Sequence, residues 1–206
     1  VATRTRFDKV NRIDGSNHLV LLCKNETGYK NLIKMVSAGF TEGFYNKPRV
    51  DHELLEEYHE GLICLSACLA GEIPQALLAG DYEKAKNLAR YYEDLFGKGN
   101  YYIEIQDHRL DEQRTVLPLL VRLSRETGIP LVATNDAHYL EKEDSRMQHI
   151  LICIQTNKTM TYWNSARMSS TSKAPTRCTS CSAHGPKPVK TRTESQRCAA
   201  LILNSA

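Results

Sequence analysis

The residues best suited to chemistry in this chain are Asp136 and His138, which stand two positions apart directly after an apolar run. The run, residues 129–134, is short, closes with Thr134 and is typical of a buried parallel strand. Positions i and i+2 of an extended segment point to the same side. A carboxylate oxygen and an imidazole nitrogen would then converge on one point, as a divalent metal ion requires. The alternative is an Asp and a His in a loop, hydrogen-bonded to backbone groups.

Two further strand ends carry metal-ligand residue types. His18 begins an apolar run at residues 18–23, and Cys68 follows another at residues 61–66. Ligands in parallel α/β folds bind at the carboxyl edge of the sheet. Imidazole, thiolate and carboxylate groups together suit zinc or another borderline transition metal. The alternative, in which His18 caps a strand and Cys68 packs as a small hydrophobe, stays open on spacing alone.

The other histidines of this region are interpreted as surface or helix-face residues rather than ligands. They are His52, His59, His108 and His149. His108 is the least secure of these interpretations because it follows Asp107 directly after an expected strand.

The elements that must position these side chains alternate along the chain. Apolar runs predict strands at residues 18–23, 61–66 and 129–134, and alternation of residue type predicts another at residues 101–106. Helices are expected through residues 30–38, over a short stretch that holds Leu54 and Leu55, and at residues 72–78, 82–96, 111–127 and 143–154. Asn25 or Thr27 and Asp51 are the expected caps of the first two, and Gly97 and Gly128 the expected stops of the fourth and fifth. Pro118 must start or kink the fifth of these helices. The alternation predicts an α/β fold with a parallel sheet or barrel.

Composition sets outer limits on function. No apolar run approaches 18 residues and no signal-peptide pattern is present, which indicates a cytoplasmic protein with no membrane contact. The net charge of +3 arises at the end of the chain, where residues 161–206 hold seven Lys and Arg against Glu194 alone. The body is therefore mildly acidic, and overall charge gives no argument for nucleic-acid binding. The pattern of the seven cysteines does not indicate a disulfide framework.

Four longer motifs allow a family to be recognised. They are His-Leu-Val-Leu-Leu-Cys from residue 18, Gly-Phe-Tyr-Asn-Lys-Pro-Arg-Val-Asp from residue 43, Leu-Ser-Ala-Cys-Leu-Ala-Gly-Glu from residue 65 and Ala-Thr-Asn-Asp-Ala-His-Tyr-Leu from residue 133. In this order they closely resemble the polymerase-and-histidinol-phosphatase (PHP) domain of bacterial DNA polymerase III alpha subunits, from about residue 6 to residue 160. The resemblance implies a distorted β/α barrel with a metal cluster at its carboxyl edge. His18, Cys68, Asp136 and His138 fall on ligand positions for a divalent metal, with zinc expected and manganese or magnesium as alternatives.

The chain also departs from the family pattern. The family's opening His-x-His strand, its Asp-His pair and a Glu ligand are absent, which leaves four of about nine ligand positions and an incomplete barrel. The polymerase carboxylates are absent too. The expectation is a fragment, inactive by itself, whose parent contacts DNA, the sliding clamp, the exonuclease subunit and the clamp loader. The alternative is a metal-dependent phosphoesterase or 3′–5′ exonuclease domain acting on DNA ends.

The last part of the chain, residues 161–206, does not share the resemblance. It is rich in Ser, Thr and basic residues, and its Cys178-x-x-Cys181 spacing is a weak metal signal without a second pair. Such composition is typical of a disordered tail. One choice of codons for residues 169–182, read in a neighbouring frame, gives a sequence close to the family's continuation. The hypothesis is that residues 161–206 are a frameshift product, and the nucleotide sequence of the gene tests it. If no single-base change in the gene restores the family's sequence, the hypothesis is wrong.

Overall fold

The structure is a computed structural model that describes residues 1–9, 15–135, 138–139, 141–157, 159 and 200–201. Its sheet has the strand order β4-β3-β2-β1-β5. The strands are β1 (Val20–Cys23), β2 (Leu62–Leu65), β3 (Tyr101–Ile105), β4 (Leu131–Ala133) and β5 (Ala200–Leu201). The helices are α1 (Glu26–Thr41), α2 (His52–Tyr58), α3 (Glu72–Leu78), α4 (Tyr82–Phe96), α5 (Asp111–Thr127) and α6 (Ser145–Thr156), the last preceded by the 3-10 turn η1 (Lys142–Asp144).

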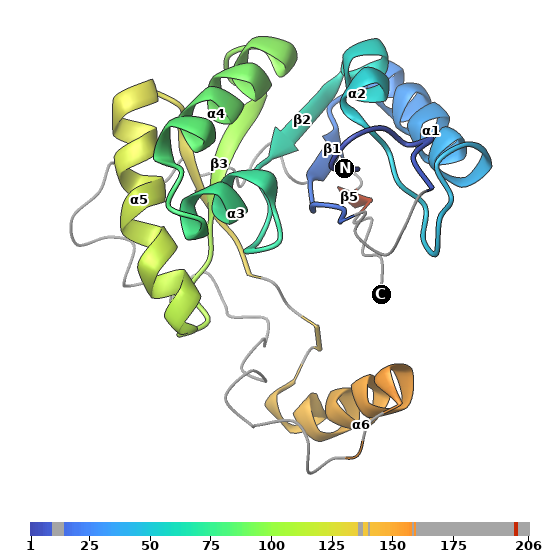
Figure 1. The fold of residues 1–206 in the computed structure, drawn as a ribbon, viewed down its shortest axis with the longest axis vertical. Coiled ribbons are helices and arrows are strands. Elements are labelled where there is room, and N and C mark those ends of the chain that lie inside the picture. Colours follow the sequence, from blue (N-terminus) through green and yellow to red (C-terminus); the bar gives the residue numbers. More distant parts are fainter. Residues whose placement is uncertain (10–14, 136–137, 140, 158, 160–199, 202–206) are drawn as a thin grey trace.

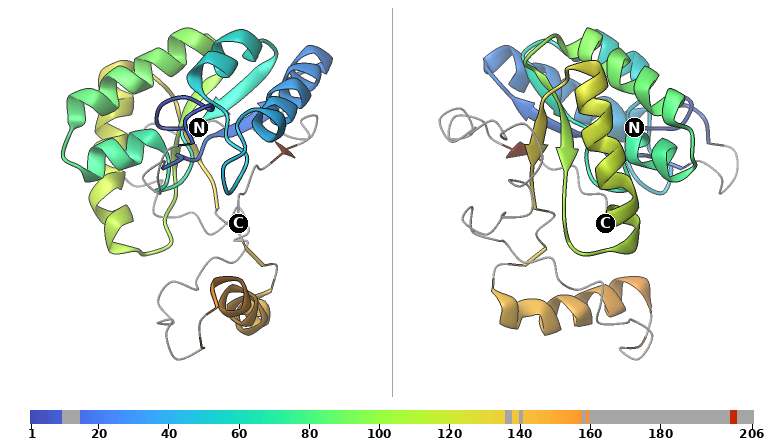
Figure 2. Two further views of the ribbon diagram at one scale, coloured as in Figure 1. Left: turned by 45° about the vertical axis from the view of Figure 1, so that its right-hand side comes forward. Right: turned by 90° about the vertical axis from the view of Figure 1, so that its left-hand side faces the viewer.

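The helices form two groups around the sheet (Figure 1). α3, α4 and α5 gather beside β2 and β3, whereas α1 and α2 lie beside β1. α6 stands apart from both groups in all three views (Figures 1 and 2). The sheet is open, and the predicted α/β fold with an incomplete barrel and flanking helices is confirmed.

Local sequence signals explain where the helices begin and end. The side chain of Asn25 accepts a hydrogen bond from the N–H of Gly28 at 2.9 Å, and Asp51 accepts one from Leu54 at 3.2 Å. Both residues therefore satisfy backbone donors that a helix start leaves unpaired. Gly97 and Gly128 end α4 and α5 with φ of 83° and 80°, which a residue without a Cβ adopts at little cost. α5 runs through Pro118 instead of starting there, which corrects one of the two expectations for that residue.

The core lies between the strands and their helices. Ile103 and Cys64 in the sheet, Leu55 of α2 and Leu123 of α5 are fully buried. Tyr92 of α4 stacks on Tyr101 of β3 with 5.5 Å between ring centroids. Burying a large apolar side chain contributes about 1.5–3 kcal/mol, so these contacts fix α4 and α5 against the sheet.

β1 does not have the direction that the sequence predicted. β2, β3 and β4 are parallel, but β1 pairs antiparallel with β2, Cys23 opposite Leu62. The reason lies in the connection: α1 leads away from the end of β1, and α2 returns the chain to nearly the same place. The N–H of Lys24 donates to the carbonyl of Gly61 at 2.9 Å, so β2 starts where β1 ends. The connection is thus a wide hairpin rather than the crossover that parallel strands need.

Candidate metal centre

The reversed β1 places His18 at the edge where the other strands end. His18 precedes β1, which runs opposite to β2, and Cys68 follows β2. The N–H of His18 donates to the carbonyl of Ala70 at 2.9 Å, and His18 forms a β-bridge with Gly71. These backbone contacts hold His18 against the loop that carries Cys68.

The side chains of His18 and Cys68 meet at this edge. Cys68 Sγ lies 3.4 Å from His18 Nδ1, and both residues are half-buried. Ala67, directly before Cys68, has φ of 64°, a left-handed conformation that strains a residue with a Cβ. Such strain persists only where the surrounding structure enforces it, and it is frequent at functional sites.

The pair fits two positions of a tetrahedral metal site. Zinc–sulfur and zinc–nitrogen bonds of about 2.3 and 2.0–2.1 Å at a tetrahedral angle separate the two ligand atoms by about 3.5 Å. The 3.4 Å between Sγ and Nδ1 matches this separation. Cys64 differs: burial raises the pKa of its thiol well above the ordinary value, so it remains a protonated core residue.

Of the two remaining predicted ligands, His138 alone belongs to the described residues, and it does not join this pair. Asp136 lies outside the described residues. His138 is described and exposed, two residues beyond Asp136. Among the residues that the structure describes, no three His, Cys, Asp or Glu side chains group as a metal site would require. Four-ligand binding therefore remains a prediction.

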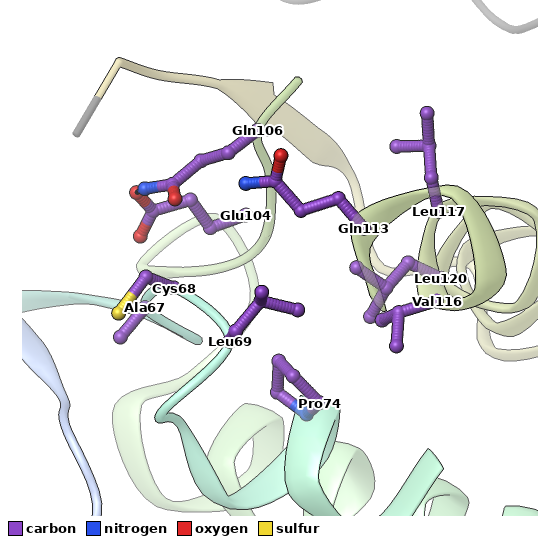
Figure 3. Close-up of a pocket in the computed structure, with 10 residues that line it drawn as sticks. All are labelled: Ala67, Cys68, Leu69, Pro74, Glu104, Gln106, Gln113, Val116, Leu117 and Leu120. Atoms are coloured by element: carbon purple, nitrogen blue, oxygen red, sulfur yellow. Dashed lines mark hydrogen bonds between the residues drawn. The ribbon is translucent and has the colours of Figure 1, made fainter. Parts of the chain in front are cut away.

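Sequence reasoning missed a polar group beside Cys68. Glu104 of β3 is buried, and it lines a small pocket with Cys68 and Gln106 (Figure 3). The apolar wall of this pocket consists of Ala67, Leu69, Pro74, Val116, Leu117 and Leu120. The Glu104 carboxylate accepts a hydrogen bond from Gln106 Nε2 at 2.9 Å and another from the hydroxyl of Thr134. The sequence signal was a lone acid inside the apolar strand Tyr-Tyr-Ile-Glu-Ile.

The interpretation of His108 as a surface residue is wrong. His108 is 6% exposed, and its backbone N–H donates to Gln113 Oε1 at 2.7 Å. The turn after β3, with Arg109 at φ of 64°, folds His108 inward against the start of α5. His59 and His149 are half-buried.

His52 forms a second polar cluster that joins three helices. Its Nε2 lies 3.2 Å from Glu72 Oε2, and the hydroxyl of Tyr92 donates to the same oxygen at 2.6 Å. The hydrogen bond to Glu72 raises the pKa of His52 against the opposing effect of burial. Burial favours a higher pKa for Glu72, but the hydrogen bonds from His52 and Tyr92 outweigh it and lower that pKa.

This cluster predicts a pH-dependent stability. A raised His52 pKa adds stability that is full below the ordinary 6.5 and is lost as pH rises through the folded value. A lowered Glu72 pKa adds stability that is full above 4.5 and is lost as pH falls through the folded value. His52→Asn should therefore lower the free energy of unfolding by about 0.5–1 kcal/mol near pH 5.5, because the pair is partly solvated, and by less near pH 9.

Urea denaturation at both pH values measures this difference. His59→Asn is the matched control, because His59 Nδ1 hydrogen-bonds the carbonyl of Glu56 at 2.9 Å, a backbone group that does not titrate. An equal loss for His52→Asn at the two pH values would show that the ion pair contributes nothing.

Similarity to known proteins defines the class to which this chain belongs. The PHP domain family matches residues 3–108, and this chain belongs to that family. DNA polymerase III subunit alpha of Treponema pallidum (strain Nichols) is 54% identical over 160 residues, 77% of this chain and 14% of that protein.

Two other alpha subunits give similar matches. The protein of Borreliella burgdorferi is 50% identical over 141 residues, 68% of this chain and 12% of its own length. The protein of Deinococcus radiodurans is 46% identical over 159 residues, 76% of this chain and 12% of its own length. This chain thus spans between 12% and 14% of these three relatives. Within the described residues, no helix has both the length and the apolar character needed to cross a bilayer.

Proposed function

We propose that this chain is the PHP region of a bacterial replicative DNA polymerase, the alpha subunit of DNA polymerase III. In this role it supports the polymerase structurally and binds a divalent metal ion at the edge formed by His18 and Cys68. The proposal is supported by the match to alpha subunits and by the 3.4 Å approach of Cys68 Sγ to His18 Nδ1, which carries the metal assignment. Residues 1–160 would form part of a PHP domain and residues 161–206 a basic tail.

The chemistry of the pair favours zinc over magnesium. A thiolate and an imidazole are ligands that zinc prefers, whereas magnesium prefers oxygen. Asp136 and His138 would complete a four-ligand site. Manganese and magnesium are the alternatives, and the carboxylate of Asp136 is the ligand of the four that would suit them. A bound ion would supply a Lewis acid able to activate water near a phosphodiester.

The chain's own residues would prepare this site. The backbone contacts of His18 to Ala70 and Gly71 hold its main chain beside the loop that carries Cys68, and Ala67, directly before Cys68, is held in a strained conformation. DNA and the replisome subunits (sliding clamp, exonuclease subunit and clamp loader) would be contacted through the remainder of the polymerase in the cytoplasm.

Zinc titration of the full chain tests the proposal. After treatment with a chelator, the protein is titrated with Zn²⁺ in competition with a chromophoric chelator. Wild type should bind about one ion per chain. Replacing a residue that only hydrogen-bonds a metal ligand typically lowers metal affinity by roughly 10–100-fold, so loss of a ligand itself in Cys68→Ser should lower Zn²⁺ affinity by more than this. His59→Asn, which removes an imidazole elsewhere, should bind as wild type does.

Two results would contradict the proposal. Failure of wild type to bind Zn²⁺ would show that the proposed metal site does not exist. Equal Zn²⁺ affinity of Cys68→Ser and wild type would show that the bound ion is not held by Cys68. Turnover of a phosphodiester by the loaded wild type, absent from Cys68→Ser, would instead favour the phosphoesterase or 3′–5′ exonuclease alternative over a supporting role.

A further inference from the structure

Helix α1 carries a second apolar face beside the one that it buries. Leu32 and Met35 belong to the core and are buried. On the neighbouring face, the large side chains are between 47% and 56% exposed, except for the partly buried Val36. This α1 stripe consists of Tyr29, Ile33, Val36 and Phe40, with Phe44 in the loop after the helix. Its first four positions advance by alternating steps of four and three residues, the spacing with which one helix packs along another.

Helix α6 carries a similar stripe. Its members are between 57% and 72% exposed and are spaced by four and then three residues: Met147, Leu151 and Ile154. Cys153 of the same helix is buried, so the exposure belongs to one face. A helix with an apolar face gains most of its stability by burying that face against another element. The α6 stripe is therefore suited to packing against a second helix.

The two stripes do not meet within one copy of the chain. α1 lies in the upper part of the molecule and α6 at its lower end (Figures 1 and 2). Soluble monomers rarely expose contiguous apolar patches of more than a few hundred Å², and larger exposed patches mark interaction sites. Each stripe thus requires a partner, and each is the kind of surface that the other would bury.

We propose that two copies of this chain form a dimer in which α6 of each copy packs along the α1 stripe of the other. In a two-fold dimer, a contact from α1 of one copy to α6 of its partner is repeated from α6 to α1. Both stripes of both copies are then buried at once. A two-fold axis that paired α1 with α1 would leave the α6 stripes exposed, unless the same axis also passed beside α6.

The exposed area is sufficient for a stable dimer only if both stripes are used. The seven exposed side chains of the two stripes would each bury about 100 Å², roughly half of what a large side chain can bury. The dimer would remove about 700 Å² per copy, or about 1,400 Å² in total, from water, within the roughly 1,200–2,000 Å² of stable interfaces. Pairing of α1 with α1 alone would bury about 800 Å², and pairing of α6 with α6 alone about 600 Å², both below that range.

Sedimentation velocity of the full chain over a range of concentrations tests the dimer. Wild type should dimerise with a Kd in the micromolar range or below, as interfaces of this size do. Ile33→Glu and Leu151→Lys each place a charge in an apolar contact that occurs twice per dimer, and each should raise the Kd by about 100-fold or more. Both side chains are exposed, so circular dichroism should show that each variant remains folded.

Mixing the two variants tests the pairing of α1 with α6. The mixed dimer would contain one unaltered contact and one in which the introduced carboxylate faces the introduced ammonium group. Association should therefore return on mixing, with a Kd at least about tenfold lower than that of either variant alone. If α1 paired with α1 and α6 with α6, the introduced charges would not face each other, and mixing would restore nothing.

Leu78→Glu is the matched control, since Leu78 is an exposed apolar residue at the end of α3, outside both stripes. This variant should dimerise as wild type does. The proposal is overturned if wild type stays monomeric at about 100 µM or grows beyond a dimer. It is also overturned if Ile33→Glu or Leu151→Lys dimerises like wild type, or if mixing the two variants restores no association.

Discussion

Gly28→Ala is expected to lower the free energy of unfolding by about 3 kcal/mol or more, because a Cβ at this position would overlap the backbone of Gly61. Gly28 lies in the first turn of α1, and its added Cβ would come within 3.0 Å of the Gly61 carbonyl group. That carbonyl accepts the hydrogen bond from Lys24 which closes the β1–β2 hairpin. Neither backbone can withdraw without breaking this connection.

A second glycine of the same helix provides the control. A Cβ on Gly39 would meet the carbonyl oxygen of Arg49 at 3.5 Å, an ordinary van der Waals contact. Gly39→Ala should therefore be neutral or stabilise by up to about 1 kcal/mol through helix propensity. Urea denaturation followed by circular dichroism measures both variants. Gly28→Ala within about 1 kcal/mol of wild type would show that α1 can move away from Gly61 at little cost.

The two glycines also show what sequence alone can predict. Asp51 was recognisable as a cap, and Asn25 as one of two candidates with Thr27, because a cap depends on residues within one turn. The strand at residues 101–106 was recognisable because alternation of residue type is a local pattern. The contact of Gly28 with Gly61 spans 33 positions and depends on how α1 packs. No local pattern encodes it.

In the candidate site too, some residues could be predicted from local sequence and others depend on how the whole chain packs. His18 and Cys68 were chosen because each adjoins an apolar run, yet the expected reason for their meeting was wrong in part: β1 is antiparallel, so the beginning of β1, not its end, lies at the shared edge. Glu104 was missed because its partners Ser66 and Thr134 belong to neighbouring strands. Strand order in a sheet is set by packing of the whole chain, and only that order brings these three residues together.

A second large effect is expected at Asp51, which joins the N-terminal segment to α2. Its carboxylate is 3% exposed and accepts hydrogen bonds from the Arg6 N–H at 2.9 Å, from Arg6 Nη1 at 3.0 Å and from Leu54 at 3.2 Å. Burial opposes the charge of Arg6, but its acidic neighbours outweigh burial and raise the Arg6 pKa. Arg6 therefore stays charged at every pH where the protein is folded.

Asp51→Ala should lower the free energy of unfolding by about 3 kcal/mol. Loss of the helix cap accounts for about 1 kcal/mol, and the rest comes from leaving a largely buried guanidinium without its buried partner. Glu42 and Glu53 still contact Arg6, both at 2.7 Å, but their side chains are 43% and 72% exposed, so water screens their charges. These solvated partners replace only part of the lost interaction.

Two further variants separate the contributions at this site. Asp51→Asn keeps the cap, for which Asn and Asp are nearly equivalent, and should lose only the part due to charge. Glu53→Gln removes an exposed partner and should change stability by less than about 1 kcal/mol. Urea denaturation at neutral pH ranks the three, with the expected order Asp51→Ala, Asp51→Asn, Glu53→Gln from most to least destabilised. If Asp51→Ala proved no worse than Glu53→Gln, the solvated carboxylates would be sufficient partners for Arg6, and burial of Asp51 would add nothing to the attachment of the segment that leads to His18.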